Sequence, residues 1–281
     1  MPITFPNGSI YKLCLLDTNA LSEIVKHPMN EGRSFIERFP PSEFVPCFLV
    51  ENLIELRRRR NVYDKFIEFF NVYPSLLAQP FTLIRNAEIA ASGRAKVNDI
   101  FVNIFTGDGV PSHFVTVVDD LFHKPGIAKL EREWQNNNQD VLNTWQARKS
   151  NFNPTNPVPN AQDAKRFVED ASVQTLCQIN PQLVKASIDA NNVDILQSFP
   201  SMQIMLYSQY YRIFNPTWKP NDQEVTDVCI SACAPYVDVV ITEIFQAEIY
   251  KKVQKHINGM SAIIATLRDI RLYPNEPKTI F

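Results

Sequence analysis

Acidic residues follow the apolar segments of this 281-residue sequence at several widely separated places. Asp17 comes directly after a short apolar run, and Glu243 comes directly after a β-branched run. Glu51 and Glu55 lie four residues apart, a spacing that places both on one face of a helix. Carboxylates that gather at one place raise one another's pKa, so a cluster of them is stable at neutral pH only with a cation or with protons.

Asp222 and Asp227 add two more carboxylates, in the first turns of a helix predicted at residues 221–234. No histidine or cysteine shares these acidic positions, and a ligand set made only of oxygen favours Mg²⁺ or Mn²⁺ over Zn²⁺. An acidic pocket with such ions suits hydrolysis of a phosphodiester: one ion activates the attacking water, and a second stabilises the leaving oxygen.

The strands and helices of an α/β fold must position these acids. The predicted strands are continuous apolar or β-branched runs, of the kind that parallel sheets bury on both faces. They cover residues 13–16, 44–50 and 237–242, and predicted helices follow them at 20–26, 51–70 and 243–256. Because a parallel sheet binds ligands at the carboxyl ends of its strands, we expect the acids to meet at one edge of one sheet.

The middle of the chain, residues 85–215, has long helical stretches and little β-branched alternation. Helices are predicted at 87–105, 124–150, 161–179 and 201–214, and a Pro- and Asn-rich loop at 151–160. The sequence therefore predicts an α/β domain formed by residues 1–84 and 216–281, with an inserted all-helical region at 85–215. Residues 81–84 are either a third short strand or a connection.

Four motifs resemble those of the PIN-domain nuclease family, in the same order along the chain. Residues 15–23 read LLDTNALSE and resemble the opening motif of that family. Residues 53–56 read LIEL and are similar to its second acidic site. Residues 227–232 read DVCISA and resemble the third, and residues 236–243 read YVDVVITE and resemble the closing strand. The chain departs from the family pattern at Glu243, where Asp is more usual.

The resemblance implies a three-layer α/β/α sandwich with a mostly parallel sheet. It also implies a ribonuclease that depends on Mg²⁺ or Mn²⁺ and hydrolyses phosphodiester bonds of RNA. The residues expected to bind the metal and to act in catalysis are Asp17, Glu55, Asp227 and Glu243. The residues expected in supporting positions are Asn19, Glu51, Asp222 and Thr242, with Asn19 steadying Asp17.

Several of these positions also have a purely structural interpretation. Asp17 is a favoured helix N-cap residue, and Asp222 has the same interpretation. Glu51 is the alternative to Glu55, although the Glu-Leu pair favours Glu55 as the site residue. Arg57 and Arg58 open a run of four arginines two residues after Glu55 and are candidates for contact with RNA phosphates. Because four consecutive residues circle a helix, the alternative is a solvated helix surface.

The composition narrows the remaining classes of function. Hydrophobic residues make up 45% and charged residues 21%, which is typical of a globular protein, and no apolar run is long enough to span a membrane. The 7 glycines form neither of the two common nucleotide-cradling motifs. The 5 cysteines form no CxxC pair and indicate reduced thiols in the cytoplasm. With a net charge of −2, RNA must be bound by a local basic patch.

Two other functions compete with the nuclease. A PIN-like fold without activity would serve as a binding or assembly module through its helical middle, with an antitoxin-like protein, another protein or a second copy of the chain as partner. A haloacid-dehalogenase-like phosphatase would need a second Asp two positions after Asp17, where Asn19 stands. We therefore set the phosphatase aside.

Overall fold

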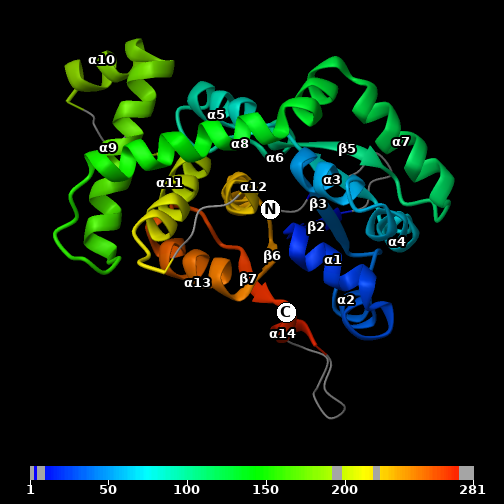
Figure 1. Ribbon diagram of the computed structural model, residues 1–281. Helices are drawn as coiled ribbons and strands as arrows, with labels where there is room; N and C mark the ends of the chain where they lie inside the picture. Colours follow the sequence, from blue (N-terminus) through cyan, green and yellow to red (C-terminus); the bar gives the residue numbers. More distant parts are fainter. Residues whose placement is uncertain (1–2, 5–9, 192–197, 218–221, 272–281) are drawn as a thin grey trace.

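The computed structural model describes residues 3–4, 10–191, 198–217 and 222–271, and the side chains of residues 3, 4, 222 and 223 are not among those described. In this part of the chain the strands form a sheet in the order β5-β4-β3-β2-β6-β7, with β1 paired to β2 off this path (Figure 1). The strands are β1 (Ile3–Thr4), β2 (Ile10–Leu16), β3 (Phe44–Phe48), β4 (Ser75–Ala78), β5 (Phe101–Phe105), β6 (Val239–Thr242) and β7 (Ile263–Thr266).

Parallel pairing dominates this sheet, as the sequence predicted. The pairs β3–β4, β2–β3, β2–β6 and β6–β7 are parallel. The pairs β1–β2 and β4–β5 are antiparallel. Leu16 of β2 lies opposite Ile241 of β6, although 225 residues separate these positions. Asp238 accepts a hydrogen bond from the backbone N–H of Leu13 at 2.8 Å, the structural role that its position within a predicted strand indicates.

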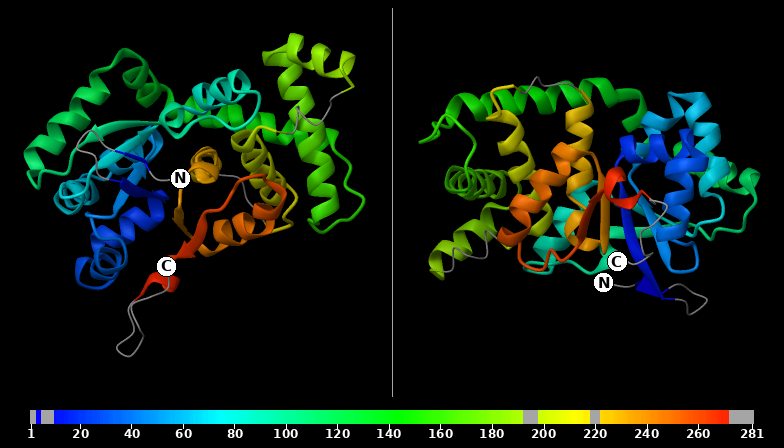
Figure 2. Two further views of the ribbon diagram at one scale, coloured as in Figure 1. Left: turned by 180° about the vertical axis from the view of Figure 1, so that it is seen from behind. Right: turned by 90° about the horizontal axis from the view of Figure 1, so that it is seen from below.

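Helices connect and cover the strands, so the chain is an α/β protein. Their bounds, in chain order, are α1 (Thr18–Lys26), α2 (Arg33–Arg38), α3 (Val50–Arg57), α4 (Arg60–Phe70), α5 (Phe81–Ala90), α6 (Val97–Ile100), α7 (Pro111–His123), α8 (Pro125–Asn151), α9 (Ala161–Ile179), α10 (Pro181–Asp189), α11 (Pro200–Ile213), α12 (Asp222–Ser231), α13 (Ile244–Val253) and α14 (Leu267–Ile270). Helices α9 and α10 lie at one end of the molecule, and β2 and β6 lie side by side in the centre (Figures 1 and 2).

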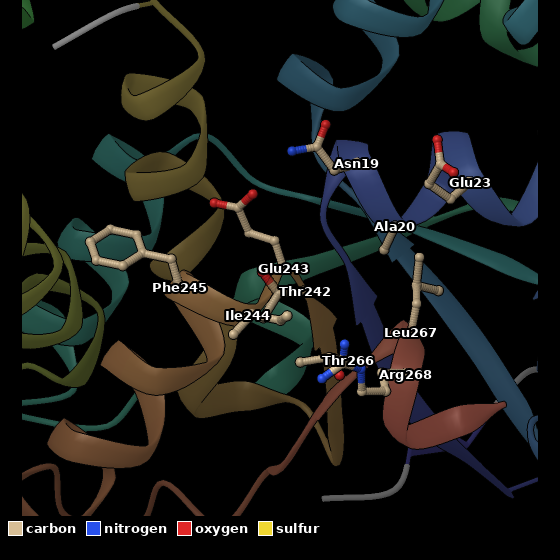
Figure 3. A pocket seen from close by; sticks show the side chains of 10 residues that line it. All are labelled: Asn19, Ala20, Glu23, Thr242, Glu243, Ile244, Phe245, Thr266, Leu267 and Arg268. Carbon is tan, nitrogen blue, oxygen red and sulfur yellow. The ribbon is translucent and has the colours of Figure 1, made fainter. Parts of the chain in front are cut away.

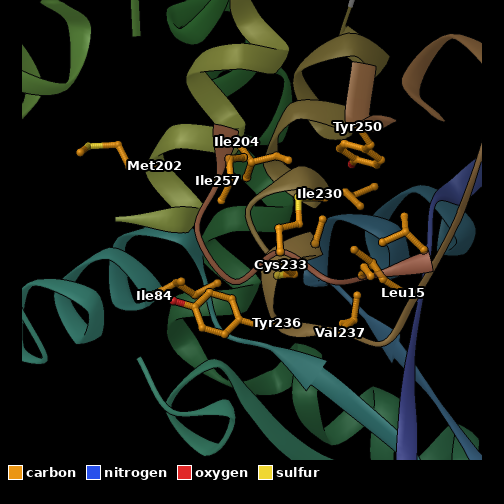
Figure 4. Close-up of a cluster of buried hydrophobic side chains, with 14 of the residues drawn as sticks. Leu15, Ile84, Met202, Ile204, Ile230, Cys233, Tyr236, Val237, Tyr250 and Ile257 are labelled. Carbon is orange, nitrogen blue, oxygen red and sulfur yellow. The ribbon is translucent and has the colours of Figure 1, made fainter. Parts of the chain in front are cut away.

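Successive residues of β2 face opposite sides of the sheet. Leu13 and Leu15 belong to one buried hydrophobic cluster, and Cys14 and Leu16 belong to another. The first cluster includes side chains of α9, α11 and α13, and part of it is shown in Figure 4. The second includes side chains of α1, α3 and α4. The apolar run that was predicted to be buried on both faces is buried in this way.

The prediction of an all-helical region at 85–215 is wrong, because this region contributes β5 to the sheet. The helix predicted at 87–105 is instead the end of α5, the short helix α6 and then β5. Ser92 and Gly93 have φ angles of 52° and 148°, which end the helical backbone after α5. Residues 101–105 then pair antiparallel with β4. The expected domain boundary at residue 84 lies inside α5.

Other predicted elements differ from the structure in smaller ways. The helix predicted at 51–70 is divided into α3 and α4, and residues 81–84 begin α5. The third strand counted from β2 is therefore β4, not residues 81–84. Strand β7 follows β6, which was expected to be the last strand. The predicted helices at 124–150, 161–179 and 201–214 agree with α8, α9 and α11 to within one residue.

Five aromatic residues of the middle region are core residues. They are at most 7% exposed: Trp134, Trp145, Tyr207, Tyr210 and Tyr211. Across the described residues, none of the helices combines the length and the apolar character that crossing a membrane requires.

Glu88 of α5 is expected to make stability depend on pH, and its replacement by Gln is expected to remove its contribution. Its carboxylate is buried and accepts hydrogen bonds from Tyr236 Oη at 2.6 Å and Ser201 N at 2.8 Å. Burial raises its pKa from 4.5 to about 7. The folded protein therefore holds a proton that the unfolded chain releases above pH 4.5, and stability falls as the pH rises toward 7.

The shift in the pKa of Glu88 corresponds to about 3 kcal/mol. We expect Glu88→Gln to gain about that much relative to wild type between pH 4.5 and pH 8, as measured by urea unfolding at the two values. If the difference in unfolding free energy between wild type and Glu88→Gln is the same at about pH 4.5 and at about pH 8, Glu88 does not titrate between these values.

Candidate active site

Asp17 is held at the point where β2 ends and α1 begins. It is the N-cap residue of α1 and is 4% exposed. Its Oδ1 accepts a hydrogen bond from Ala20 N at 2.6 Å, and its Oδ2 accepts from the Thr242 hydroxyl and from Glu243 N at 2.9 Å. Burial raises its pKa, although these hydrogen bonds and the backbone N–H of Asn19 oppose the rise. The N-cap interpretation is therefore correct, and the same carboxylate also contacts the end of β6.

Glu243 lies beside Asp17 because their strands are neighbours in the sheet. Thr242 ends β6, and Glu243 is the N-cap residue of α13. Burial raises the pKa of Glu243, and the negative charge of Asp17 raises it further. The Asn19 side chain hydrogen-bonds Glu243 and lowers this pKa. Asn19 thus steadies Asp17 only through its backbone, and its side chain serves Glu243.

Asp227 of α12 faces the same place and pairs with an arginine. Arg212 of α11 places its Nη2 at 3.3 Å from Oδ2 of Asp227, and its Nε donates to Glu224, one turn earlier on α12. Burial raises the pKa of Asp227 to about 8, and the charges of Asp17, Glu243 and Glu224 contribute to the rise. The positive charge of Arg212 lowers the pKa of Asp227 but does not offset the rise.

Asp17, Asp227, Glu243 and Glu224, which we call the acid cluster, carry more negative charge than Arg212 offsets. When ionised, the four carboxylates have four negative charges against the one positive charge of the guanidinium. Burial is the main cause of the raised pKa of Asp227, and the negative charges of Asp17, Glu243 and Glu224 raise this pKa further. Gathered carboxylates of this kind favour the uptake of a proton or of a further cation.

Glu55 joins the segment that contains Asp17 to the helix that contains Asp227. Its carboxylate accepts a hydrogen bond from the Thr226 hydroxyl at 3.1 Å and from Thr18. Burial raises its pKa, and these hydrogen bonds oppose the rise. Glu55 thus contacts Thr18 and Thr226, which are the sequence neighbours of Asp17 and Asp227.

Glu51 lies in the first turn of the same helix, α3, and its charge acts on Cys229 of α12 and on Cys233, two residues after the end of α12. Burial raises its pKa, with a further contribution from the charge of Glu55. Its negative charge also raises the pKa of Cys229 and of Cys233. Asp222 begins α12, and its side chain lies outside the described residues.

The two arginines proposed for RNA contact have different surroundings. Arg57 pairs with Asp119 at 3.2 Å and Glu131 at 3.6 Å and lies over the ring of Phe122, so α7 and α8 hold it. Arg58 is exposed and close enough to Glu55 for its charge to lower the pKa of that carboxylate. Arg58, with its neighbour Arg59, is therefore the better placed of the two for contact with a phosphate near the cluster.

The donor atoms of the acid cluster suit a hard divalent cation, because all of them are carboxylate oxygens. In residues 10–191, 198–217 and 222–271, no group of three or more His, Cys, Asp or Glu side chains is arranged to hold a metal ion as it stands. The Arg212 guanidinium already places positive charge beside Asp227 and Glu224. The residues therefore fit Mg²⁺ or Mn²⁺ in chemistry, and binding requires the carboxylates to draw together.

A pocket of about 400 Å³ opens next to the acid cluster. Figure 3 shows the Asn19 and Glu243 side chains extending toward one another from α1 and from the start of α13. Much of the wall is apolar, and polar atoms come from residues such as Thr242 and Arg268. Because Glu243 belongs to both the pocket and the cluster, a molecule in the pocket lies next to the acids.

Two residues of this site, Arg212 and Glu224, were not among those predicted from the sequence. Glu224 precedes Asp227 by three residues, a spacing that places both on one face of α12. Arg212 is the only charged residue of α11, whose sequence is PSMQIMLYSQYYRI. A lone charge in a helix of apolar and neutral residues is a signal that it has a buried partner.

No family model matches this chain, and comparison with curated proteins and with solved structures likewise gave no match.

Proposed function

We propose that this protein is a PIN-like nuclease that depends on Mg²⁺ or Mn²⁺ and hydrolyses phosphodiester bonds of RNA. The observation that carries the proposal is that Asp17 and Glu243 adjoin one another where the parallel strands β2 and β6 end, with Asp227 of α12 close enough for their charges to raise its pKa. The fold expected with this function is a three-layer α/β/α sandwich. Helices in the buried clusters on both faces of the sheet support it.

The roles of the residues follow from their surroundings. Asp17, Asp227 and Glu243 would hold the cation, and Glu55 would keep α3 in register with α1 and α12 through Thr18 and Thr226. Bound Mg²⁺ or Mn²⁺ supplies the positive charge that activates water and offsets the charge of the phosphoryl group. Glu243 lines the pocket and is placed to accept the proton of the attacking water as the bond from phosphorus to the leaving oxygen breaks.

The substrate would lie between two sources of positive charge. Arg58 and Arg59 flank the cluster on the side of Glu55, and the exposed Arg268 lines the pocket on the other side. Phosphates of a single strand can contact these arginines while one nucleotide occupies the pocket. These arginines would supply the local positive charge that RNA binding by a chain with a net charge of −2 requires.

A second candidate function is favoured by Arg212. Its pairing with Asp227 and Glu224 places a cation of the protein itself in the acid cluster. A PIN-like module without activity, which binds a protein partner through the helical middle, would need no other cation. Binding of a divalent cation to the wild-type protein separates the two functions.

Mn²⁺ is expected to raise the melting temperature of the wild-type protein and to have little effect on Asp17→Asn. At a concentration of 100 times the dissociation constant, the ion contributes about 2.7 kcal/mol, which corresponds to roughly 5 °C in a protein of this size. Differential scanning fluorimetry with and without Mn²⁺ measures the shift.

Glu37→Gln is the matched control, because it removes one carboxylate that pairs with Arg33 on the surface of α2. This variant should keep the full shift. Equal shifts in wild type and Asp17→Asn would place the ion elsewhere, and the absence of any shift in wild type would favour the binding module.

A further inference from the structure

Arg212 is the most completely buried charged group at the acid cluster. Its side chain is 0% exposed, whereas the Asp227 and Glu224 side chains are 16% and 19% exposed. An arginine keeps its positive charge in any protein environment, so its burial requires negative charge close by. Its two acidic partners both come from α12 and supply that charge.

The guanidinium group bridges the two carboxylates with two of its three nitrogens. Nε donates to Glu224, and Nη2 lies 3.3 Å from Asp227 Oδ2. The group lies over the Phe245 ring, with 5.6 Å between Cζ and the ring centroid. Its Nη1 is buried and has no hydrogen-bond partner among the described residues, so the two carboxylates of α12 do not use all the donors of the group.

We propose that Arg212 is the built-in second cation of the acid cluster, so that the site binds a single divalent cation instead of two. This inference rests on the proposed nuclease function. Two-metal sites place a second cation beside the first, about 3.5–4 Å from it. Here Arg212 already places positive charge on two of the acids, because its guanidinium bridges Asp227 and Glu224 with 3.3 Å between Nη2 and Oδ2 of Asp227.

Arg212 contacts only the two acids of the cluster that come from α12, Asp227 and Glu224. Asp17 and Glu243 adjoin one another where β2 and β6 end, and no basic side chain pairs with either of them among the described residues. A divalent cation shared by Asp17, Glu243 and Asp227 offsets the negative charge that Arg212 leaves. A second divalent cation would have to displace a buried guanidinium, whose charge would then lack a partner.

The number of bound Mn²⁺ ions tests this inference. We expect the full-length wild-type protein, titrated with Mn²⁺ and followed by calorimetry and by electron paramagnetic resonance of the free ion, to bind one ion at the cluster. Arg212→Gln removes the guanidinium charge and should bind two ions. Arg212→Lys keeps a positive charge and should bind one, as should the surface control Glu37→Gln.

The outcomes separate this inference from the function on which it rests. Two ions in wild type would overturn the role of Arg212 and leave the metal-dependent site standing. One ion in both wild type and Arg212→Gln would also overturn it. No ion in wild type would overturn the proposed function itself. If Arg212→Gln does not fold, the counts for wild type and Arg212→Lys still decide, because two ions in either contradict the inference.

Discussion

Asp17→Asn is expected to lower the Mn²⁺-dependent cleavage of single-stranded RNA by at least about 100-fold. The lower limit follows from metal sites in general, where loss of a residue that only orients a ligand costs roughly 10–100-fold in activity. Asp17 contributes a charged ligand and accepts hydrogen bonds from both Thr242 and Glu243. Its replacement therefore removes negative charge from the centre of the acid cluster and one anchor between β2 and β6. The rate of cleavage of a fluorescent RNA oligonucleotide, with EDTA as the metal-free reference, measures the effect.

The Asn variant keeps the local structure well enough to make that comparison. Asn is as favoured an N-cap residue as Asp, so its side-chain oxygen still accepts from Ala20 N at the start of α1. Circular dichroism and urea unfolding establish that the variant is folded. Cleavage by Asp17→Asn within a few-fold of the wild-type rate would contradict the proposed active site.

Arg212→Met is expected to lower the free energy of unfolding by about 3–5 kcal/mol at pH 7, the range found when one partner of a buried ion pair is removed. The substitution fills similar space and leaves Asp227 and Glu224 without a counterion. Urea unfolding in a buffer without Mn²⁺, at constant ionic strength, measures the loss. We expect the loss to be larger than that of any surface ion pair, such as Arg33 with Glu37, because exposed pairs contribute about 0–1 kcal/mol.

A second substitution shows whether the loss comes from unpaired charge. In the double variant Arg212→Met/Asp227→Asn, one of the two stranded carboxylates is gone, so the double variant should be more stable than the sum of the single effects predicts. Simple additivity of the two substitutions would indicate that Arg212 stabilises the protein through packing on Phe245 alone.

Elements with local signals were predicted well from the sequence. Helix α9 begins after the side-chain cap of Asn160 and ends before Pro181, and both signals lie within a few residues of its ends. Strand β5 gives no such signal. Its five residues become a strand because β4 offers a free edge, and β4 itself lies more than twenty residues earlier in the chain. Its pairing is a tertiary effect that local spacing does not reveal.

The same difference explains which parts of the site were predicted. Asp17 and Glu243 follow strands, and the parallel order of strands places both at one edge, so their approach was predictable from position alone. The partners of Arg212 depend on how α11 packs against α12, and nothing in either helix by itself specifies that contact. Sequence analysis therefore predicted Asp17, Asp227 and Glu243 but not Arg212, which pairs with Asp227 and Glu224.

The pairing of β2 with β6 has a consequence for how the protein is made. The two strands that carry Asp17 and Glu243 meet across 225 residues, and such distant contacts form late and slowly. During translation, an N-terminal nascent chain contains Asp17 and Glu55 but has no assembled acid cluster until residue 243 has left the ribosome. Under the proposed function, the nascent chain would in this way stay inert beside its own messenger until both strands have been made.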